Sequence, residues 1–485
     1  MEQSLRKKTY SSLIWKFCER FSAQFVSLVV SIILARMLMP EDYGIVALVT
    51  IFITIANVLV TNGMGTALIQ NNDADDNDFS TMFWASFGLS IVLYMIVFFS
   101  APIIAKIYDN NLITIVLRIM GLRIPLSAMN SIQQAYVSKK LIFRKFFVST
   151  MFGTIASAIV GIALAFKGYG VWALVWQYLV NCFISTIVLF FTLKWRPKFV
   201  FDYLRFKVLF SYAWKIMAAG LIGTIFNEIK GLIVGTKYDS ESLAYYNKGD
   251  QIPALIVNNV NSSIESVAFP VMSKIQGDKI RVKSVCNKMI KMSNCILMPM
   301  LFGLAAVAEP LVIILLTEKW LLVVPFIQIL CLGKIFSITD TINTQAIKAI
   351  GKSDTLLKLE FIKKPVYLTL IVIGAFISPL GIAIFGAVYS IIGLFINLYP
   401  NVKYLGYKYS EQVLLIFPQL AASAIMCASV LFFNSILRFN VFVNLFIEVL
   451  LGVVIYFIAT LILDKKIILD IISLIGKKRG NSNEC

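Results

Sequence analysis

Long apolar stretches alternate with short polar connections along the whole chain. A helix that crosses a bilayer needs about 20 mostly apolar residues, and this pattern predicts about fourteen membrane-spanning helices. Their approximate bounds are 11–35, 42–65, 80–105, 112–137, 146–166, 171–192, 207–235, 242–269, 284–308, 320–349, 361–377, 381–398, 412–433 and 442–463. The spans at 112–137 and 242–269 are comparatively polar, so the expected count lies between twelve and fourteen.

The composition agrees with a membrane protein and excludes a large soluble domain. Of the 485 residues, 59% are hydrophobic and 14% are charged, whereas soluble domains carry about a quarter charged residues. The first apolar stretch is longer than the core of a signal peptide and contains Lys16, Glu19 and Arg20. We therefore expect it to be retained as the first span.

Lysine and arginine are concentrated in every second connection between the predicted spans. One set of connections holds 26 of them and the alternate set holds six. Cytoplasmic loops carry this excess in membrane proteins, so both termini are predicted to be cytoplasmic. The same bias accounts for the net charge of +18 without nucleic-acid binding. The connection at 71–78 is an exception, because it is acidic although it is expected on the cytoplasmic side.

A sequence pattern recurs after about 200 residues. Ile14-Trp15-Lys16 and the turn at 40–44 correspond to Ala213-Trp214-Lys215 and the segment 240–246. This recurrence predicts two lobes related by an axis along the membrane normal. The expected fold is an all-α polytopic membrane protein with two pseudo-symmetric six-helix lobes and two further helices. The predicted lobes are residues 1–200 and 201–405, followed by two helices at 406–465 and a basic cytoplasmic tail at 466–485.

Residue types that several chemistries require are absent or unsuitably spaced. The chain has no histidine, and its seven cysteines form no CxxC pair, so we expect no metal site, disulfide framework or cofactor. It also lacks a GxxxxGK[ST] loop, which argues against transport driven by its own ATP hydrolysis. The driving force would then be an ion gradient, the membrane potential or consumption of the substrate.

Several polar side chains fall inside the predicted spans. A charge at bilayer depth costs about 2.5–3.5 kcal/mol on insertion scales, so it should face protein or water. Cations outnumber anions, and arginine binds phosphate oxygens in a bidentate manner, which favours a cavity for an anionic substrate. The alternative is that lysines extend to the interface and the other groups pair between helices. The candidate cavity residues are Arg20, Arg123, Arg118, Lys16, Lys215, Lys334, Gln24, Asn57 and Asn258.

Three carboxylates also fall inside predicted spans. They are Glu228, Glu265 and Asp340. Each is a candidate for ion coupling, and a structural pair with a basic side chain is the alternative.

Short motifs resemble those of the Wzx-type polysaccharide flippases of the multidrug/oligosaccharidyl-lipid/polysaccharide exporter superfamily. Leu38-Met39-Pro40-Glu41-Asp42-Tyr43-Gly44 resembles the family turn L-x-P-E-[DE]-[FY]-G, and Ala244 departs from the usual glycine of the second turn. The other similar segments are Gln134-Ala135-Tyr136-Val137, Phe143-Arg144-Lys145, Gly168-Tyr169-Gly170-Val171-Trp172-Ala173-Leu174-Val175, Trp195-Arg196-Pro197 and Leu243-Ala244-Tyr245-Tyr246-Asn247-Lys248.

The resemblance implies a MATE-like fold in a bacterial cytoplasmic membrane and no catalytic residue. It implies translocation of undecaprenyl-diphosphate-linked oligosaccharide from the inner to the outer leaflet, by alternating access around a cationic cavity. A polysaccharide polymerase and glycosyltransferases would be partners. A lipid II flippase and a MATE-type small-molecule antiporter are the alternatives. A membrane polymerase or acyltransferase is disfavoured, because the external loops are short and histidine is absent.

Overall fold

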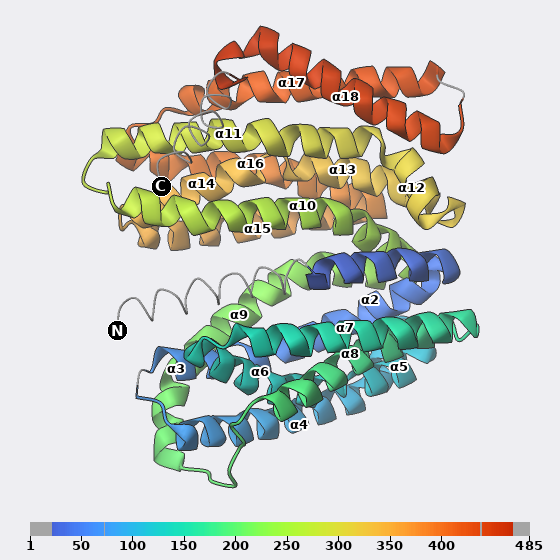
Figure 1. The fold of residues 1–485 in the computed structure, drawn as a ribbon, viewed down its shortest axis with the longest axis vertical. Coiled ribbons are helices and arrows are strands. Elements are labelled where there is room, and N and C mark those ends of the chain that lie inside the picture. The colour runs from blue at the N-terminus through green and yellow to red at the C-terminus, as the bar shows by residue number, and fades with distance from the viewer. Residues whose placement is uncertain (1–21, 72, 437–438, 469–485) are drawn as a thin grey trace, which may run out of the picture. The chain divides into compact units, whose positions relative to one another are not determined.

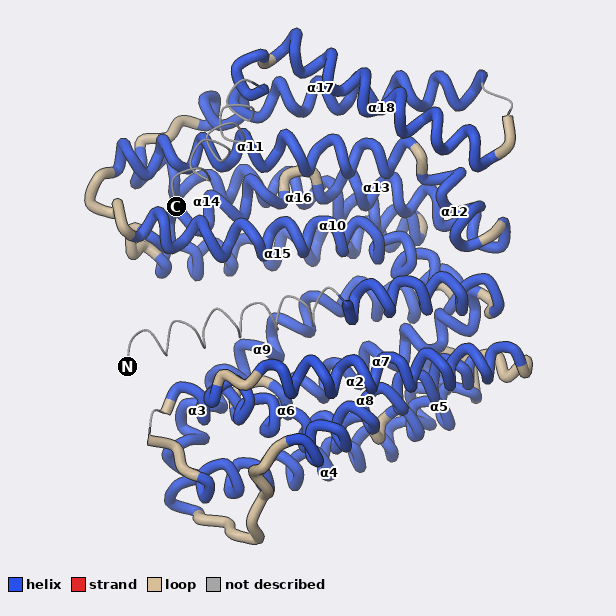
Figure 2. The backbone as a smooth tube through the Cα atoms, in the orientation of Figure 1, coloured by secondary structure: helices blue, strands red, loops and turns tan. Residues whose placement is uncertain are grey.

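The computed structural model describes residues 22–71, 73–436 and 439–468, and every regular element in these ranges is a helix (Figure 1). The chain divides into two compact units, Met1–Ala244 and Tyr245–Cys485. Short loops join most of the helices within each unit (Figure 2). Each unit therefore has its own helical core.

The first unit begins, within the described residues, with a helix at Ser22–Met37. The helices that follow it are α2 (Pro40–Thr61), α3 (Met64–Gln70), α4 (Asp76–Ile107), α5 (Leu112–Met120), α6 (Arg123–Lys140), α7 (Phe143–Phe166), α8 (Val171–Thr192) and α9 (Tyr203–Lys237).

The second unit contains most of α10 (Ser240–Ser273), because the division falls inside this helix. The elements after it are α11 (Lys279–Ala306), α12 (Ala308–Leu316), the 3₁₀ helix η1 (Glu318–Val323), α13 (Val324–Lys334), α14 (Ser337–Ala349), α15 (Ser353–Ile377), α16 (Pro379–Leu405), α17 (Tyr409–Ile436) and α18 (Val441–Leu463).

Eleven helices or near-continuous helix pairs of the described residues are long and apolar enough to cross a membrane. The chain is therefore an all-helical, multi-pass membrane protein, and these spans coincide with predicted ones. Two further long helices, α10 and α15, coincide with the predicted spans at 242–269 and 361–377 but are more polar. The first predicted span lies partly outside the described residues, so the total of fourteen stays a prediction.

Helix α9 belongs to the first compact unit, although the sequence pattern assigns it to the second lobe. It packs against α2, α3 and α4. The contact with α2 is close, because a Cβ at Gly231 would lie 2.8 Å from the Ile51 side chain. A Cβ at Gly63, which has a φ of +98°, would lie 2.5 Å from the backbone carbonyl oxygen of Ala213 and 2.5 Å from the Met217 side chain. The boundary between the compact units thus falls one helix later than the predicted lobe boundary, and the lobes themselves stay a prediction.

Three of the membrane spans are interrupted. The span Pro40–Gln70 is interrupted at Asn62 and Gly63, between α2 and α3. In the span Leu112–Lys140 the interruption separates α5 from α6 at Gly121 and Leu122. Pro125 explains it, because its ring has no N–H and would collide with the carbonyl four residues earlier in a continuous helix. The span Glu318–Ala349 is interrupted between α13 and α14, just after Lys334.

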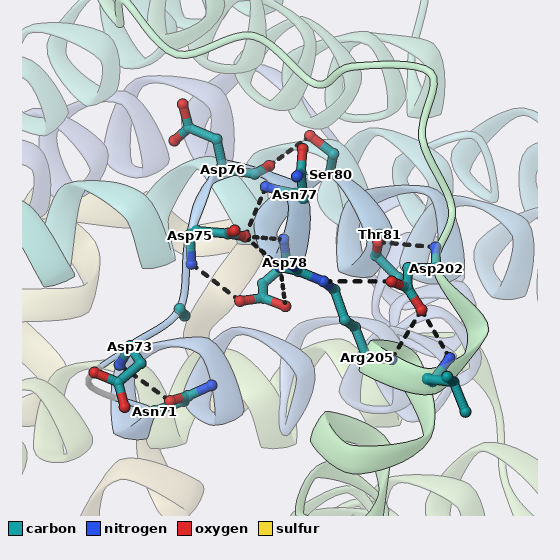
Figure 3. A network of polar contacts seen from close by, with 12 residues as sticks. Asn71, Asp73, Asp75, Asp76, Asn77, Asp78, Ser80, Thr81, Asp202 and Arg205 are labelled. Carbon is teal, nitrogen blue, oxygen red and sulfur yellow. Dashed lines mark hydrogen bonds and ion pairs between the residues drawn. The ribbon is translucent and has the colours of Figure 1, made fainter.

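Ion pairs join the acidic connection before α4 to the first turn of α9 (Figure 3). Asp75 caps α4 by accepting hydrogen bonds from the backbone N–H groups of Asn77 and Asp78, each at 2.9 Å. Arg205 Nη1 lies 2.7 Å from Asp75 Oδ1 and 3.3 Å from Asp78 Oδ1. This basic partner explains why the connection is acidic on a side expected to carry positive charge.

A lysine at the end of α6 holds the other half of the same connection. Lys139 Nζ donates to the backbone carbonyls of Leu68, Asn71 and Ala74 at 3.2, 2.7 and 3.1 Å. These carbonyls lie at the end of α3 and just after it, where no further helical N–H is available to them. Lys139 and Arg205 together fix the segment between α3 and α4 within the first unit.

Candidate functional site

A polar pocket of about 480 Å³ lies within the first unit. Its walls come from α2, α6, α7 and α8, and most of its lining side chains carry amide or hydroxyl groups. The lining residues are Thr61, Asn62, Arg123, Ser127, Asn130, Ser131, Gln134, Phe146, Thr150, Tyr178, Asn181, Cys182 and Ser185. This pocket is the candidate substrate site.

The polar wall on α6 follows from its sequence spacing. Arg123, Ser127, Asn130 and Gln134 are separated by three or four residues, so they lie on one face of the helix. Helix α8 contributes Tyr178, Asn181 and Ser185 at the same spacing. Two facing helices thus present polar stripes to the same space.

Hydrogen bonds hold these two stripes in place. Gln134 Nε2 donates to Asn130 Oδ1 at 2.9 Å, and Asn130 Nδ2 donates to Thr186 Oγ1 of α8 at 3.1 Å. Ser131 Oγ donates to the backbone carbonyl of Thr61, at the end of α2, at 3.2 Å. These bonds tie α6 to both α8 and α2, so the positions of the lining amides are defined by the packing.

Arg123 supplies the only positive charge among the lining residues, and none of those residues is acidic. It is the first residue of α6, and its guanidinium carbon lies 5.0 Å from the centre of the Tyr178 ring. Its Nε is buried and has no hydrogen-bond partner in the described part of the chain. A buried guanidinium N–H with no partner is costly, so the site is suited to an anionic group that accepts this bond.

Other predicted cavity residues of the first unit lie outside this pocket. Arg118 Nε donates to the backbone carbonyl of Phe98 at 3.2 Å, with the guanidinium 4.3 Å from that ring. Asn57 is half-buried, and its Oδ1 has no hydrogen-bond partner among the described residues. Gln24 is half-buried and Lys215 is exposed. Lys16 and Arg20 lie outside the described residues.

The predicted residues of the second unit are separated from one another. Lys334 Nζ forms an ion pair with Asp250 Oδ1 at 3.0 Å, and Asn258 is exposed on α10.

The three candidate carboxylates belong to three different helices, α9, α10 and α14. Asp340 accepts a hydrogen bond from Asn397 Nδ2. Glu265 is exposed, and Glu228 is half-buried on α9 of the first unit. Within the described ranges, no group of three His, Cys, Asp or Glu side chains is placed to hold a metal.

Sequence reasoning about charge identified Arg123 but missed the neutral part of the pocket. Asn130, Asn181 and Ser185 carry no charge, and they barely change the mean hydropathy of a whole span. The signal that would have found them is the three-to-four-residue spacing of polar side chains on α6 and α8.

The fold defines the class of protein. The structure superposes on the lipid II flippase MurJ in its inward closed conformation with a TM-score of 0.77 and 17% identity, covering 94% of this chain and 100% of that one. It also superposes on an inward-facing MATE family multidrug resistance transporter of the MOP superfamily, with a TM-score of 0.60, 13% identity and coverage of 80% and 96%. The chain therefore has the fold shared by MurJ and MATE transporters.

The family follows from sequence comparison. A family model described as "Polysaccharide biosynthesis protein" matches residues 33–325, more than half of the chain. The teichuronic acid biosynthesis protein TuaB of Bacillus subtilis (strain 168) is 24% identical over 72% of this chain and 73% of its own length. The lipopolysaccharide biosynthesis protein WzxC of Escherichia coli (strain K12) is 23% identical over 85% and 84%. The chain belongs to this polysaccharide biosynthesis family of Wzx-type flippases, which consists of transporters and not of enzymes.

Proposed function

We propose that this protein translocates undecaprenyl-diphosphate-linked oligosaccharide from the inner to the outer leaflet of a bacterial cytoplasmic membrane. The oligosaccharide would serve the synthesis of a surface polysaccharide, with a polymerase and glycosyltransferases as partners of the protein. Both termini are cytoplasmic in this proposal, in agreement with the distribution of lysine and arginine. Membership of the polysaccharide biosynthesis family supports the class of substrate.

The single observation that carries the proposal is the buried Nε of Arg123, which has no hydrogen-bond partner among the described residues and lies in a pocket lined by no acid. A diphosphate oxygen accepts hydrogen bonds from a guanidinium strongly, because both partners are charged. The surrounding amides and hydroxyls of Asn130, Gln134 and Asn181 are suited to the hydroxyl groups of a sugar. The polyprenyl chain can remain in the bilayer while the headgroup occupies the pocket.

Translocation is proposed to occur by alternating access of the two predicted lobes around a cationic cavity. The coupling ion is left open between H⁺, Na⁺ and uncoupled transport. Glu228, Glu265 and Asp340 remain the candidates for ion coupling proposed from the sequence.

The test is flipping by the purified full-length chain in liposomes that contain a defined undecaprenyl-diphosphate-linked oligosaccharide. The measurement is the fraction of oligosaccharide that becomes accessible to a membrane-impermeant glycosidase. We expect Arg123→Ala to slow flipping at least tenfold, which corresponds to about 1.4 kcal/mol or more. Arg118→Ala, which removes a cation of the same interrupted span that does not line the pocket, should retain most of the activity.

The outcomes separate the proposal from its alternatives. Full activity in Arg123→Ala would remove the pocket from the mechanism. No flipping of the oligosaccharide lipid by the wild-type protein, together with flipping of lipid II, would favour the lipid II alternative. Uptake of organic cations instead would favour a MATE-type antiporter, which a pocket lined by no acid does not support.

A further inference from the structure

A carboxylic acid is buried on α18, far along the sequence from the pocket. Glu448 is 1% exposed, and neither of its carboxyl oxygens has a hydrogen-bond partner in the described part of the chain. It lies seven residues after Val441, about 10 Å into the helix at 1.5 Å per residue. The side chain therefore lies well inside a span that has no other charged residue.

The packing of α18 shows that Glu448 faces protein. The helix packs against α11, α12 and α17, and its buried residues include Glu448, Gly452 and Thr460. A Cβ added at Gly452, one turn after Glu448, would lie 3.4 Å from Val430 and 3.8 Å from Met426 of α17. Glu448 thus belongs to the face that contacts neighbouring helices, and its carboxyl cannot extend to water from there.

No base in the packed helices neutralises this carboxyl. The only charged residue of α12 is Glu309, an exposed acid near enough to repel a charge on Glu448. The only charged residue of α17 is Glu411, in its first turn. The basic residues of α11 all lie in its first half and are Lys279, Arg281, Lys283, Lys288 and Lys291.

The basic groups of α11 that reach α17 and α18 already have acidic partners. Lys291 Nζ pairs with Asp464 Oδ2 at 2.6 Å, and Lys283 pairs with Glu411. Asp464 follows Glu448 by sixteen residues, about 24 Å along the helix. In the described part of the chain, the lysines of α11 that pair with these two helices therefore do so at the opposite end of α18 from Glu448.

An ionised carboxylate in such a place is so unfavourable that the group takes up a proton instead. We propose that Glu448 is a proton-binding site, occupied in this packing of α18. Loss of the proton requires water or a counter-charge to reach the carboxyl. Deprotonation of Glu448 therefore weakens the packing of α18 against α12 and α17. Proton occupancy would thereby control the packing of the last two helices, independently of which substrate the pocket binds.

The first test is the pH dependence of thermal unfolding of the detergent-solubilised full chain, followed by circular dichroism. Unfolding exposes Glu448 and releases its proton, so rising pH should favour unfolding of the wild-type protein. Glu448→Gln keeps the shape of the side chain and removes the proton. We expect the unfolding equilibrium constant of the wild type, relative to this variant, to rise by up to tenfold per pH unit between about pH 5 and 7.

Two variants serve as controls. Glu448→Asp keeps an ionisable group and should keep the pH dependence, whereas Glu309→Gln removes only a repelling neighbour and should reduce the pH dependence far less than Glu448→Gln does. Infrared spectra provide an independent readout, because a protonated carboxyl has a C=O band that a carboxylate lacks. We expect this band at neutral pH in the wild type and in Glu309→Gln, and its loss in Glu448→Gln. An unchanged spectrum in Glu448→Gln, or a stability difference that is constant with pH, would overturn the proposal.

Discussion

In the first unit, the interrupted span Leu112–Lys140 places Arg123 beside the interruption, and in the second unit the interrupted span Glu318–Ala349 places Lys334 there. Arg123 faces a pocket lined by no acid. Lys334 is neutralised by Asp250 on α10 at 3.0 Å. A cation inside a span therefore indicates an anion site only where the neighbouring helices provide no counter-charge.

A second pair of positions shows the same contrast. In the first unit Asn130 of α6 donates to Thr186 of α8, and in the second unit Asp340 of α14 accepts from Asn397 of α16. The two bonds join helices that occur in the same order along each unit. The first unit has a neutral amide where the second has an acid, and this keeps its pocket positive.

The largest expected effect on flipping comes from replacing Asn130 of the first unit by an acid, as Asp340 is in the second unit. Asn130→Asp places a carboxylate in the pocket that contains Arg123, where it would neutralise the guanidinium and repel a diphosphate. Flipping of the oligosaccharide lipid should fall at least tenfold, measured by glycosidase protection in liposomes. The reverse change, Asp340→Asn, leaves the pocket of Arg123 without an acid, so the charge of the pocket predicts a smaller loss of flipping than for Asn130→Asp.

Thermal unfolding of both variants is the control for this prediction. If Asn130→Asp folds as stably as the wild type and still flips at the wild-type rate, the positive charge of the pocket has no role in transport. If Asp340→Asn abolishes flipping without loss of stability, Asp340 gains support as an ion-coupling residue.

A smaller effect is expected for the ion pair of the second unit. Lys334→Ala or Asp250→Ala leaves one charge inside the unit without its partner, whereas the double variant removes both. Each of the two side chains is 26% exposed, so water weakens the penalty. We expect a coupling energy of about 1 kcal/mol in a double-mutant cycle of thermal stability. Flipping rates that follow the stability losses would agree with a structural pair, and a loss of flipping in the double variant at unchanged stability would contradict it.

The smallest expected effect concerns two of the acidic helix caps, Asp75 before α4 and Asp278 before α11. The Asp78 N–H and the Arg205 guanidinium hold the pKa of Asp75 below its ordinary value. A carboxylate with a lowered pKa in the folded state stabilises the protein above its unfolded-state pKa, and this stabilisation is lost as the pH falls through the folded-state pKa.

Asp75→Asn keeps a capping side chain and removes the charge. We expect its Tm to be about 1–2 °C below that of the wild type at pH 7, with the difference shrinking as the pH falls below about 4. Asp278 is the matched control, because its ion pair is a local one with Arg281 at 4.0 Å. An equal pH-dependent loss in Asp278→Asn would show that the contact between Asp75 and Arg205 adds nothing to the cap.

The sequence by itself determined the helical class and the position of most membrane spans. The prediction succeeded because the length of an apolar run is a local property, and a helix satisfies its own backbone hydrogen bonds wherever it lies in a bilayer. The motifs that resemble the Wzx-type family predicted the family correctly. The charge of Arg123 inside a predicted span was also enough to mark it as a candidate cavity residue.

Only the tertiary structure decided which of the polar groups has a partner. Lys334 and Asp250 belong to different helices, and Arg205 meets Asp75 across more than a hundred residues of sequence. Helical spacing predicts the face on which a side chain lies, but the group opposite that face depends on how distant segments pack. Glu448 was missed for the same reason. One carboxyl barely changes the mean hydropathy of an apolar helix, and its burial depends on the packing of α18 against α11, α12 and α17.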